Sequence, residues 1–163
     1  MPPITIRKAT RKDSKPLLDL IDALADYEKL KRPTTSARRR LIEDAFSRRR
    51  RYDAILAFVG DRPVGYAIIL EIYSSFLALP TLYLEDIFIV PELRRRRIGF
   101  RLFQFCVNEA KKRGCGRLEW MVLDWNSPAI GFYKKIGARH LKEWLPFRLE
   151  QAQFGSVIRA KRS

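Results

Sequence analysis

Hydrophobic residues recur with a period of two in some segments of the chain and of about 3.6 in others, which separates predicted strands from predicted helices. Residues 4–7 alternate like a short strand. A helix follows, with Asp13 or Ser14 as its N-cap and an inward face formed by Leu17, Leu20, Ile21, Leu24 and Tyr27. The same spacing predicts a second helix over residues 36–46.

The middle of the chain is rich in β-branched and aromatic residues and predicts three strands. Residues 52–59 and 64–73 are joined by the short segment Gly-Asp-Arg-Pro at residues 60–63, which predicts a hairpin of antiparallel strands. After a loop, residues 82–90 form the third predicted strand.

The C-terminal part predicts two more helices. The first covers residues 98–113 and leads to a strand over residues 118–123. The second begins at Ser127 and Pro128, an N-cap followed by a proline at the first helical position, and Gly137 closes it. A final β-rich region is expected over residues 144–154.

These elements predict an α+β or mixed α/β fold, with one sheet and helices on both of its faces. No repeat, low-complexity segment or linker divides the sequence. Because 47% of the 163 residues are hydrophobic, the chain can bury a core of ordinary size. We expect residues 1–158 to form a single domain and residues 159–163 to form a basic tail.

The charge of the chain is unusual. It has 33 Lys and Arg against 18 Asp and Glu, a formal net charge of +15. Such an excess favours polyanions, namely nucleic acid, an anionic membrane or a phosphate-rich cofactor. Two arginine runs, at residues 38–40 and 48–51, are interpreted as solvated faces. A third run, at residues 94–97, directly precedes a predicted helix.

Other classes of protein are disfavoured. No apolar run is long enough to span a membrane, and the first residues lack the apolar stretch of a secretory signal. Cys106 and Cys115 resemble neither a disulfide framework nor a metal motif, and His140 is the sole histidine. We therefore expect a cytoplasmic protein that binds no metal.

The most informative unit is a strand, a short loop and a helix between residues 84 and 99. A helix that starts directly after a tight loop exposes unpaired backbone N–H groups and the positive end of its dipole. The arginines at residues 94–97 add charge and hydrogen-bond donors at that point. The arrangement favours a phosphate or pyrophosphate site over the alternative, a solvated turn.

This segment resembles the acetyl-CoA signature of GNAT acetyltransferases, Arg/Gln-x-x-Gly-x-Gly/Ala. Arg94 matches its first position and Gly99 its last, while Arg97 replaces the middle glycine. The resemblance implies acetyl-CoA as co-substrate. The residues it places against acetyl-CoA are Ile87, Phe88, Ile89, Arg94, Arg95, Arg96, Arg97, Ile98, Gly99, Phe100, Asn126, Pro128 and Ala129.

The resemblance extends to the spermidine/spermine (diamine) and thialysine N-acetyltransferase branch. It is carried by the segments at residues 6–10, 24–28, 83–89, 124–133 and 134–138. This branch implies a mostly antiparallel sheet of six to seven strands that splays between the strands matching residues 82–90 and 118–123. It also implies a homodimer, for which the C-terminal strands could supply an interface.

Two adjacent acids, Glu85 and Asp86, lie in an otherwise apolar strand, and alternation puts them on opposite faces. An unpaired carboxylate in a sheet is costly, so each needs a partner or a wet cleft. Both can be structural. A protonated amine must lose a proton before it attacks a thioester, and the family assigns that base role and ammonium binding to the glutamate matching Glu85. Asp86 is interpreted as structural.

Two residues of the last predicted helix have a structural and a functional interpretation. By itself Tyr133 is more typical of a core tyrosine, but the matching family residue protonates the leaving CoA thiolate. Asn126 can cap the helix, hydrogen-bond the cofactor arm as its family counterpart does, or do both.

Tyr27 and Glu28 match a pair that lines the amine pocket in this branch, although core packing and a surface carboxylate explain them nearly as well. Lys29, Lys31 and Arg32 stand where polyamine acetyltransferases have acids. Positive charge there repels a polycationic amine and favours a lysine-like or thialysine-like amino acid, whose carboxylate meets those cations.

The sequence thus favours an enzyme that moves an acetyl group from acetyl-CoA to a small primary amine by direct attack in a ternary complex. A cysteine-linked acetyl intermediate is disfavoured, because Cys106 falls on an apolar helix stripe. The alternatives are acetylation of a protein or RNA-associated amine, and a basic protein that binds CoA or nucleic acid, or associates with the ribosome, without catalysis.

Overall fold

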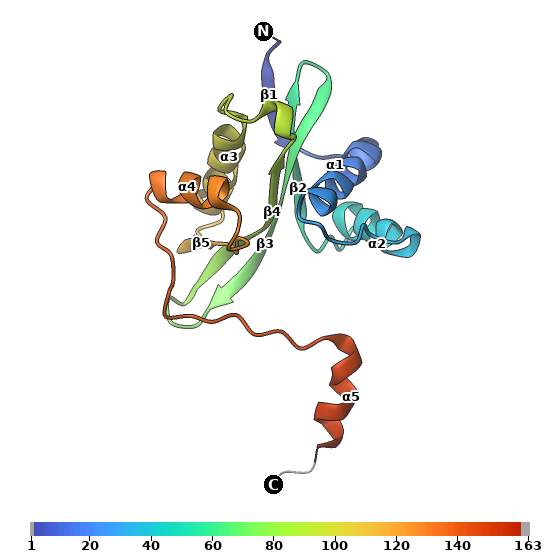
Figure 1. Ribbon diagram of the computed structural model, residues 1–163, viewed down its shortest axis with the longest axis vertical. Helices are drawn as coiled ribbons and strands as arrows, with labels where there is room; N and C mark the ends of the chain where they lie inside the picture. The colour runs from blue at the N-terminus through green and yellow to red at the C-terminus, as the bar shows by residue number, and fades with distance from the viewer. Residues whose placement is uncertain (1, 161–163) are drawn as a thin grey trace. The chain divides into compact units, whose positions relative to one another are not determined.

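The computed structural model describes residues 2–160, whose contacts group the chain into two compact units divided between Met121 and Val122. The first unit contains a five-stranded sheet in the order β1-β2-β3-β4-β5 (Figure 1). The strands are β1 (Ile4–Lys8), β2 (Asp53–Val59), β3 (Arg62–Ser74), β4 (Leu79–Ile89) and β5 (Arg117–Glu119). The first four are antiparallel neighbours, and only β4 and β5 run parallel.

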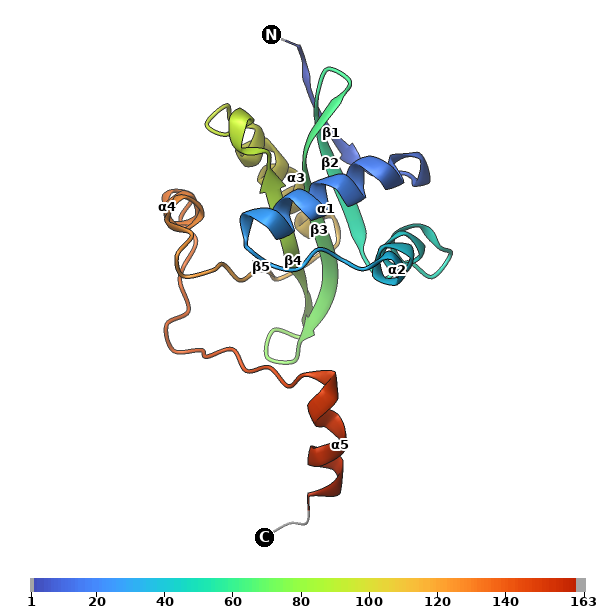
Figure 2. The same ribbon diagram turned by 45° about the vertical axis from the view of Figure 1, so that its right-hand side comes forward.

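Helices cover both faces of this sheet, as the sequence pattern predicts. Helices α1 (Ser14–Tyr27) and α2 (Thr35–Phe46) lie on one face, and α3 (Ile98–Lys112) lies on the other (Figures 1 and 2). Each follows the expected apolar spacing to within a residue or two at its ends. Asp13 is the N-cap residue of α1, one of the two residues predicted for that position.

The core on the α1 face is built from the alternating residues of β2, β3 and β4. Tyr66 lies at its centre, fully buried, and Tyr27 packs on its margin. The buried members of this cluster are Leu17, Leu20, Ala54, Leu56, Tyr66, Ile68 and Phe88. Since β4 contributes Phe88 to this core, the C-terminal end of the strand is held firmly where the loop to α3 begins.

The sheet opens between β4 and β5. The two strands pair only at Thr81–Arg117, Leu82–Leu118 and Tyr83–Glu119. Beyond Tyr83, β4 continues to Ile89 with β3 on one side, and no strand within residues 2–160 pairs with it on the other. The strand predicted over residues 118–123 is therefore shorter than expected, because its partner diverges after Glu119. The predicted splay is present.

The prediction of a β-rich region over residues 144–154 is wrong. Within the described part of the second unit, no residue forms a strand, and the segment ends in a helix, α5 (Gln151–Arg159). Glu150 and Gln153 form a capping box that starts this helix, so local hydrogen bonds replace strand pairing. Pro146, which has no N–H to donate, lies within the segment.

Two further predictions concern the C-terminal part. Five strands are present among residues 2–160 instead of six to seven, because the C-terminal segment supplies none. Of the basic tail predicted over residues 159–163, Arg159 ends α5 and residues 161–163 lie outside the described residues. The single domain predicted for residues 1–158 stays a prediction.

Candidate active site

The loop between β4 and α3 is built from a short 3₁₀ turn, Pro91–Leu93, and the four arginines that follow it. Arg95 and Arg97 have left-handed backbone conformations, with φ of 62° and 61°. An L-residue in this region costs about 1–2 kcal/mol relative to a right-handed one, and glycine does not. Arg97, the residue in place of the signature glycine, thus keeps the backbone shape that glycine would supply, and it is the N-cap of α3.

The side chain of Arg94 points back into the fold. Its Nε donates a hydrogen bond to the carbonyl oxygen of Ile89 at 3.0 Å, and its guanidinium lies 4.3 Å from the ring centroid of Tyr27. The same guanidinium lies 5.6 Å from the ring centroid of Phe88. These contacts tie the loop to the end of β4 and to α1. Arg94 therefore positions the loop, whereas Arg95, Arg96 and Arg97 are exposed.

The start of α3 can bind an anion. The first N–H groups of a helix have no partner within it, and the helix dipole is positive there. Helix α3 begins at Ile98, directly after the arginines, and Gly99 packs close to Ile89, with its absent Cβ 3.6 Å from Ile89 Cγ1. The residues predicted to contact the cofactor from β4 (Ile87, Phe88, Ile89), from the loop and from the first turn of α3 thus lie in one continuous stretch. The arrangement fits a phosphate or pyrophosphate group.

The end of α1 packs against the same strand. The rings of Tyr27 and Phe88 are 6.2 Å apart and tilted, and Arg94 stacks on both. Glu28 is the C-cap residue of α1, and burial raises its pKa. Strand β4 begins 51 positions after Glu28 in the sequence, so only the fold brings this predicted pair beside the strand.

Asp86, which is interpreted from the sequence as structural, has a hydrogen-bond partner and a raised pKa. Tyr66 Oη donates a hydrogen bond to Asp86 Oδ2 at 3.1 Å. Burial raises the pKa of Asp86 to about 6, and the negative charges of Glu85 and Glu28 raise it further, against the effect of the Tyr66 hydrogen bond. Asp86 and Glu28 thus form a carboxyl cluster on the α1 face, while Glu85 is exposed. Such a cluster attracts an ammonium group.

The sequence profile of the Acetyltransferase (GNAT) family matches residues 17–138, which include the α1 end, β4, the arginine loop and α3. The chain belongs to the GNAT acetyltransferase family. It is 34% identical over 161 residues to a thialysine N-epsilon-acetyltransferase from Sus scrofa, covering 92% of this chain and 94% of the relative. It is also 44% identical over 85 residues to an L-ornithine N5-acetyltransferase from Arabidopsis thaliana, covering 52% of this chain and 37% of the relative.

Among solved structures, an integron cassette protein from the mobile metagenome of V. cholerae has a TM-score of 0.79 at 22% identity. The match covers 96% of the acetyltransferase and 98% of that chain, and it shows the shared fold. The family and fold class expected from the sequence are therefore confirmed, as is the expectation of an acetyltransferase.

The remaining predicted site residues lie in the second unit of the acetyltransferase. Asn126 is the N-cap residue of α4 (Ser127–Lys135), and its side chain accepts a hydrogen bond from the backbone N–H of Ala129 at 3.4 Å. Of the two caps considered from the sequence, Asn126 and Ser127, the structure has Asn126, and Pro128 lies in the first turn. Tyr133 packs edge-on against Phe132, with ring centroids 5.5 Å apart, and burial raises its pKa to about 12.

No cluster of three or more His, Cys, Asp or Glu side chains that could hold a metal ion is present within residues 2–160. None of the helices described is long and apolar enough to cross a membrane.

Because Asp86 is largely buried, the variant Asp86→Asn should differ from the wild type in how its stability depends on pH. Because the folded pKa is about 6 and the ordinary value is 3.8, the folded protein binds this proton more tightly than the unfolded chain. Its stability therefore falls as pH rises from about 4 to 6, by about 2 kcal/mol. Asn keeps the shape and removes this loss, so the variant should be the more stable protein at pH 7.5 and the two should converge near pH 4.

Urea unfolding of both proteins across this pH range measures the effect, and steady-state kinetics with the amine measures its functional cost. If Asp86 contacts the ammonium group, kcat/KM for the amine falls about tenfold or more while the KM for the acetyl donor is unchanged. If the variant gained stability and kept full activity, Asp86 would have a purely structural role and would not contact the ammonium group.

Proposed function

We propose that the chain acetylates the side-chain amine of a small lysine-like or thialysine-like amino acid, or a diamine, with acetyl-CoA as donor. The observation that carries this proposal is the arrangement along β4: an anion-binding helix start follows its end, and a carboxyl cluster of Asp86 and Glu28 lies beside it. One end of the arrangement suits a pyrophosphate and the other an ammonium group. The thialysine N-epsilon-acetyltransferase name of the Sus scrofa relative supports the choice of amine.

The chemistry is a direct transfer in a ternary complex. The neutral amine attacks the thioester carbonyl, the C–N bond forms, the C–S bond breaks, and the sulfur leaves as a thiolate. A carboxylate accepts the proton that the amine loses. Glu85 is the residue proposed for this step, and it would act through a water, because alternation puts it on the opposite face of β4 from Asp86. Tyr133 is proposed to return a proton to the thiolate, since a phenol of high pKa is still protonated at neutral pH. Buried Cys106, whose pKa burial raises to about 12, is unsuited to carry an acetyl group.

Selection among amines is proposed to depend on the segment after α1. Arg32 donates hydrogen bonds to Asp26 at 2.8 and 2.5 Å, so its charge is largely matched by that carboxylate. Lys29 and Lys31 are exposed, and neither has an ion pair within residues 2–160. These two lysines, without Arg32, are therefore the cations that repel a polyamine and attract the carboxylate of an amino acid.

Charge reversal at the two lysines tests this selection. The double variant Lys29→Glu, Lys31→Glu should raise kcat/KM for spermidine relative to thialysine by about tenfold or more, because two repulsive charges become attractive. Competition kinetics with both amines in one reaction give the ratio directly. Arg39→Glu with Arg40→Glu, on α2, changes the total charge equally and should leave the ratio unaltered; an equal shift in both variants would mean that net charge alone sets the preference.

Binding of acetyl-CoA and transfer are separable in one set of experiments. Saturating CoA at 100 times its Kd should stabilise the folded protein by about 2.7 kcal/mol, seen as a higher melting temperature. A screen of amino acids, diamines and polyamines with acetyl-CoA then identifies the acceptor. No thermal shift with CoA would overturn the donor assignment, and a shift without turnover of any amine would favour a CoA-binding protein that lacks catalysis.

The proposal extends to the assembly and location of the enzyme. We infer a homodimer in the cytoplasm, because members of the related branch usually pair as dimers and because Cys106 and Cys115 do not form a disulfide framework. Sedimentation at several protein concentrations tests the dimer. A protein or RNA-associated amine is the second acceptor class, and the +15 charge supports it.

A further inference from the structure

The arginines of α2 and of the turn after it take no part in the acetyl-transfer site. Arg38 pairs with Asp22 at 2.6 Å, and Arg50 pairs with Asp53 at 3.2 Å. The others are exposed, and none of them has an ion pair within residues 2–160; they are Arg39, Arg40, Arg48, Arg49 and Arg51. Five unmatched cations on a helix and one adjoining turn repel one another, which favours a polyanion as their partner.

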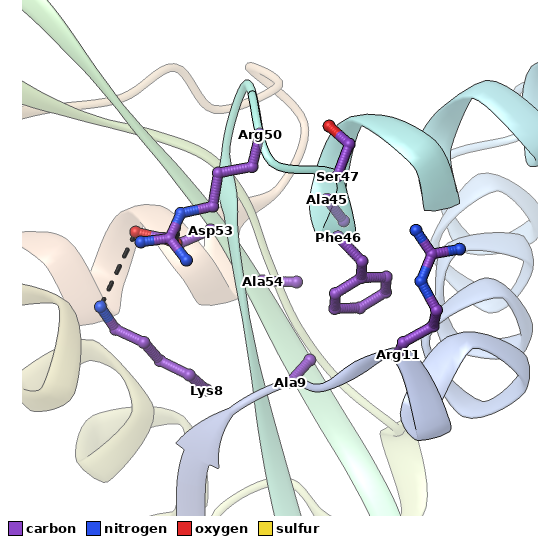
Figure 3. A pocket seen from close by; sticks show the side chains of 9 residues that line it. All are labelled: Lys8, Ala9, Arg11, Ala45, Phe46, Ser47, Arg50, Asp53 and Ala54. Carbon is purple, nitrogen blue, oxygen red and sulfur yellow. Dashed lines mark ion pairs between the residues drawn. The ribbon is translucent and has the colours of Figure 1, made fainter.

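A cavity of about 210 Å³ opens beside this turn (Figure 3). It lies between the end of α2, the chain that leaves β1 and the start of β2, at the β1 edge of the sheet. Its apolar lining is formed by Ala9, Ala45, Phe46 and Ala54. Figure 3 shows the ring of Phe46 between Ala9 and the side chain of Arg11. An aromatic ring at the wall of an otherwise small-residue cavity can stack against a flat, unpaired base.

The polar lining of the cavity consists of Lys8, Arg11, Ser47, Arg50 and Asp53. The cations on it are held by exposed or long ion pairs: Arg11 meets Glu43 at 3.4 Å, and Lys8 meets Asp53 at 3.8 Å. Exposed pairs of this kind contribute about 0–1 kcal/mol each. Arg11 can therefore exchange its carboxylate for a phosphate at little cost. Arg50 can do so because its partner, the largely buried Asp53, keeps its ion pairs with Arg113 and Lys8. Lys8 is held more closely, by buried Glu109 at 2.8 Å.

The residues exposed on α2 and on the turn that follows it favour nucleic acid over a membrane as the partner. None of the large hydrophobic side chains that are exposed in the described chain lies between residues 31 and 71. A surface that binds at a membrane interface places apolar side chains into the lipid, and this face has none. Glu43 and Asp53 on this face are already paired, with Arg11 and Arg50 respectively.

We propose that α2, the turn over residues 47–51 and the adjoining cavity form a binding site for single-stranded nucleic acid, with one base in the cavity against Phe46 and the flanking phosphates on Arg48, Arg49, Arg51 and Arg11. The site is separate from acetyl transfer and does not depend on the proposed function. It lies at the β1 edge, whereas the arginine loop follows β4.

Binding of labelled RNA and DNA oligonucleotides of about 12 nucleotides, measured against salt, tests the site. The triple variant Arg48→Gln, Arg49→Gln, Arg51→Gln should bind about tenfold more weakly, and its slope of log K against log salt should be smaller by about 2, or about 0.7 for each lost contact. Acetyltransferase activity should be unchanged. The control variant Lys134→Gln, Lys135→Gln, Lys142→Gln removes the same charge from exposed lysines without an ion pair in the described chain.

Equal loss of affinity in the two variants would overturn the proposal, because binding would then follow net charge. Duplex DNA and vesicles of anionic lipid complete the comparison: a preference for either over single strands would contradict the site, and a preference for RNA over DNA or the reverse identifies the natural strand.

Occupation of the cavity is tested in the wild-type protein with oligonucleotides that carry 5-iodouridine. On irradiation this base cross-links to an aromatic side chain that it touches, and mass spectrometry should locate the product at Phe46. The cross-link should disappear with excess unlabelled single strand. Cross-links confined to Trp120, Trp125 or Trp144, with none at Phe46, would show that no base enters the cavity.

Discussion

Tyr133→Phe should lower kcat by about 10²–10⁴-fold, the usual contribution of a positioned general acid. Without the hydroxyl, the thiolate must leave unprotonated or take its proton from water. Burial holds the pKa of Tyr133 at about 12, so the phenol is protonated throughout the range of ordinary assays. The alkaline limb of the rate profile therefore belongs to another group, and its position should be the same in the variant.

Steady-state kinetics against pH, together with melting curves, measure this effect. Tyr73→Phe removes the same hydroxyl from the exposed end of β3 and serves as the matched control, with unchanged kcat. Both variants should unfold within about 1 kcal/mol of the wild type. An active Tyr133→Phe enzyme within twofold of the wild type would take Tyr133 out of the mechanism and leave proton transfer to water.

The second large effect is expected at Gly65, which faces Ile89 across the β3–β4 ladder. A Cβ at Gly65 would lie 2.6 Å from the carbonyl oxygen of Phe88 and would collide with Ile89 Cδ1. A backbone atom cannot rotate away, so the end of β4 must shift. Gly65→Ala should destabilise the protein by about 1–3 kcal/mol and weaken CoA binding, because the displaced segment carries the loop to α3.

Chemical unfolding and CoA titration of the same samples measure both consequences. Gly131→Ala is the control of opposite sign: no heavy atom lies within 4 Å of its added Cβ, and alanine favours the helix interior by about 0.5–1 kcal/mol. If Gly65→Ala were as stable as the wild type and bound CoA normally, the close packing of β3 against the end of β4 would have no part in shaping the site.

Many of the candidate site residues could be predicted from short segments of the sequence. The arginine loop, the helix start at Ile98 and the adjacent acids at 85 and 86 are contiguous, and their elements follow from apolar periodicity within a few residues. The exception is the C-terminal segment. Its alternating Phe147 and Leu149 predicted a strand, yet pairing depends on a partner that no local pattern reveals, and the capping box at Glu150 gave a helix instead.

The roles of individual charges required the tertiary structure. Sequence predicts a cofactor contact for Arg94, which stays a prediction, and it gives no sign that the guanidinium stacks on Tyr27 while Nε donates to the carbonyl oxygen of Ile89. Sequence treated Asp86 as structural, but burial and the approach of Glu28 raise its pKa. Both outcomes depend on contacts between α1 and β4, which are remote in the chain.

The sequence by itself therefore determined the family, the order of elements as far as α4 and the arginine-rich helix start after β4, since these rest on residues close together along the chain. Only the tertiary structure decided which arginine of that segment is turned inward, that Arg97 adopts the left-handed backbone of a glycine, and which carboxyl is buried. The physical reason is that side-chain direction, desolvation and ion pairing are set by distant neighbours, and periodicity carries no information about them.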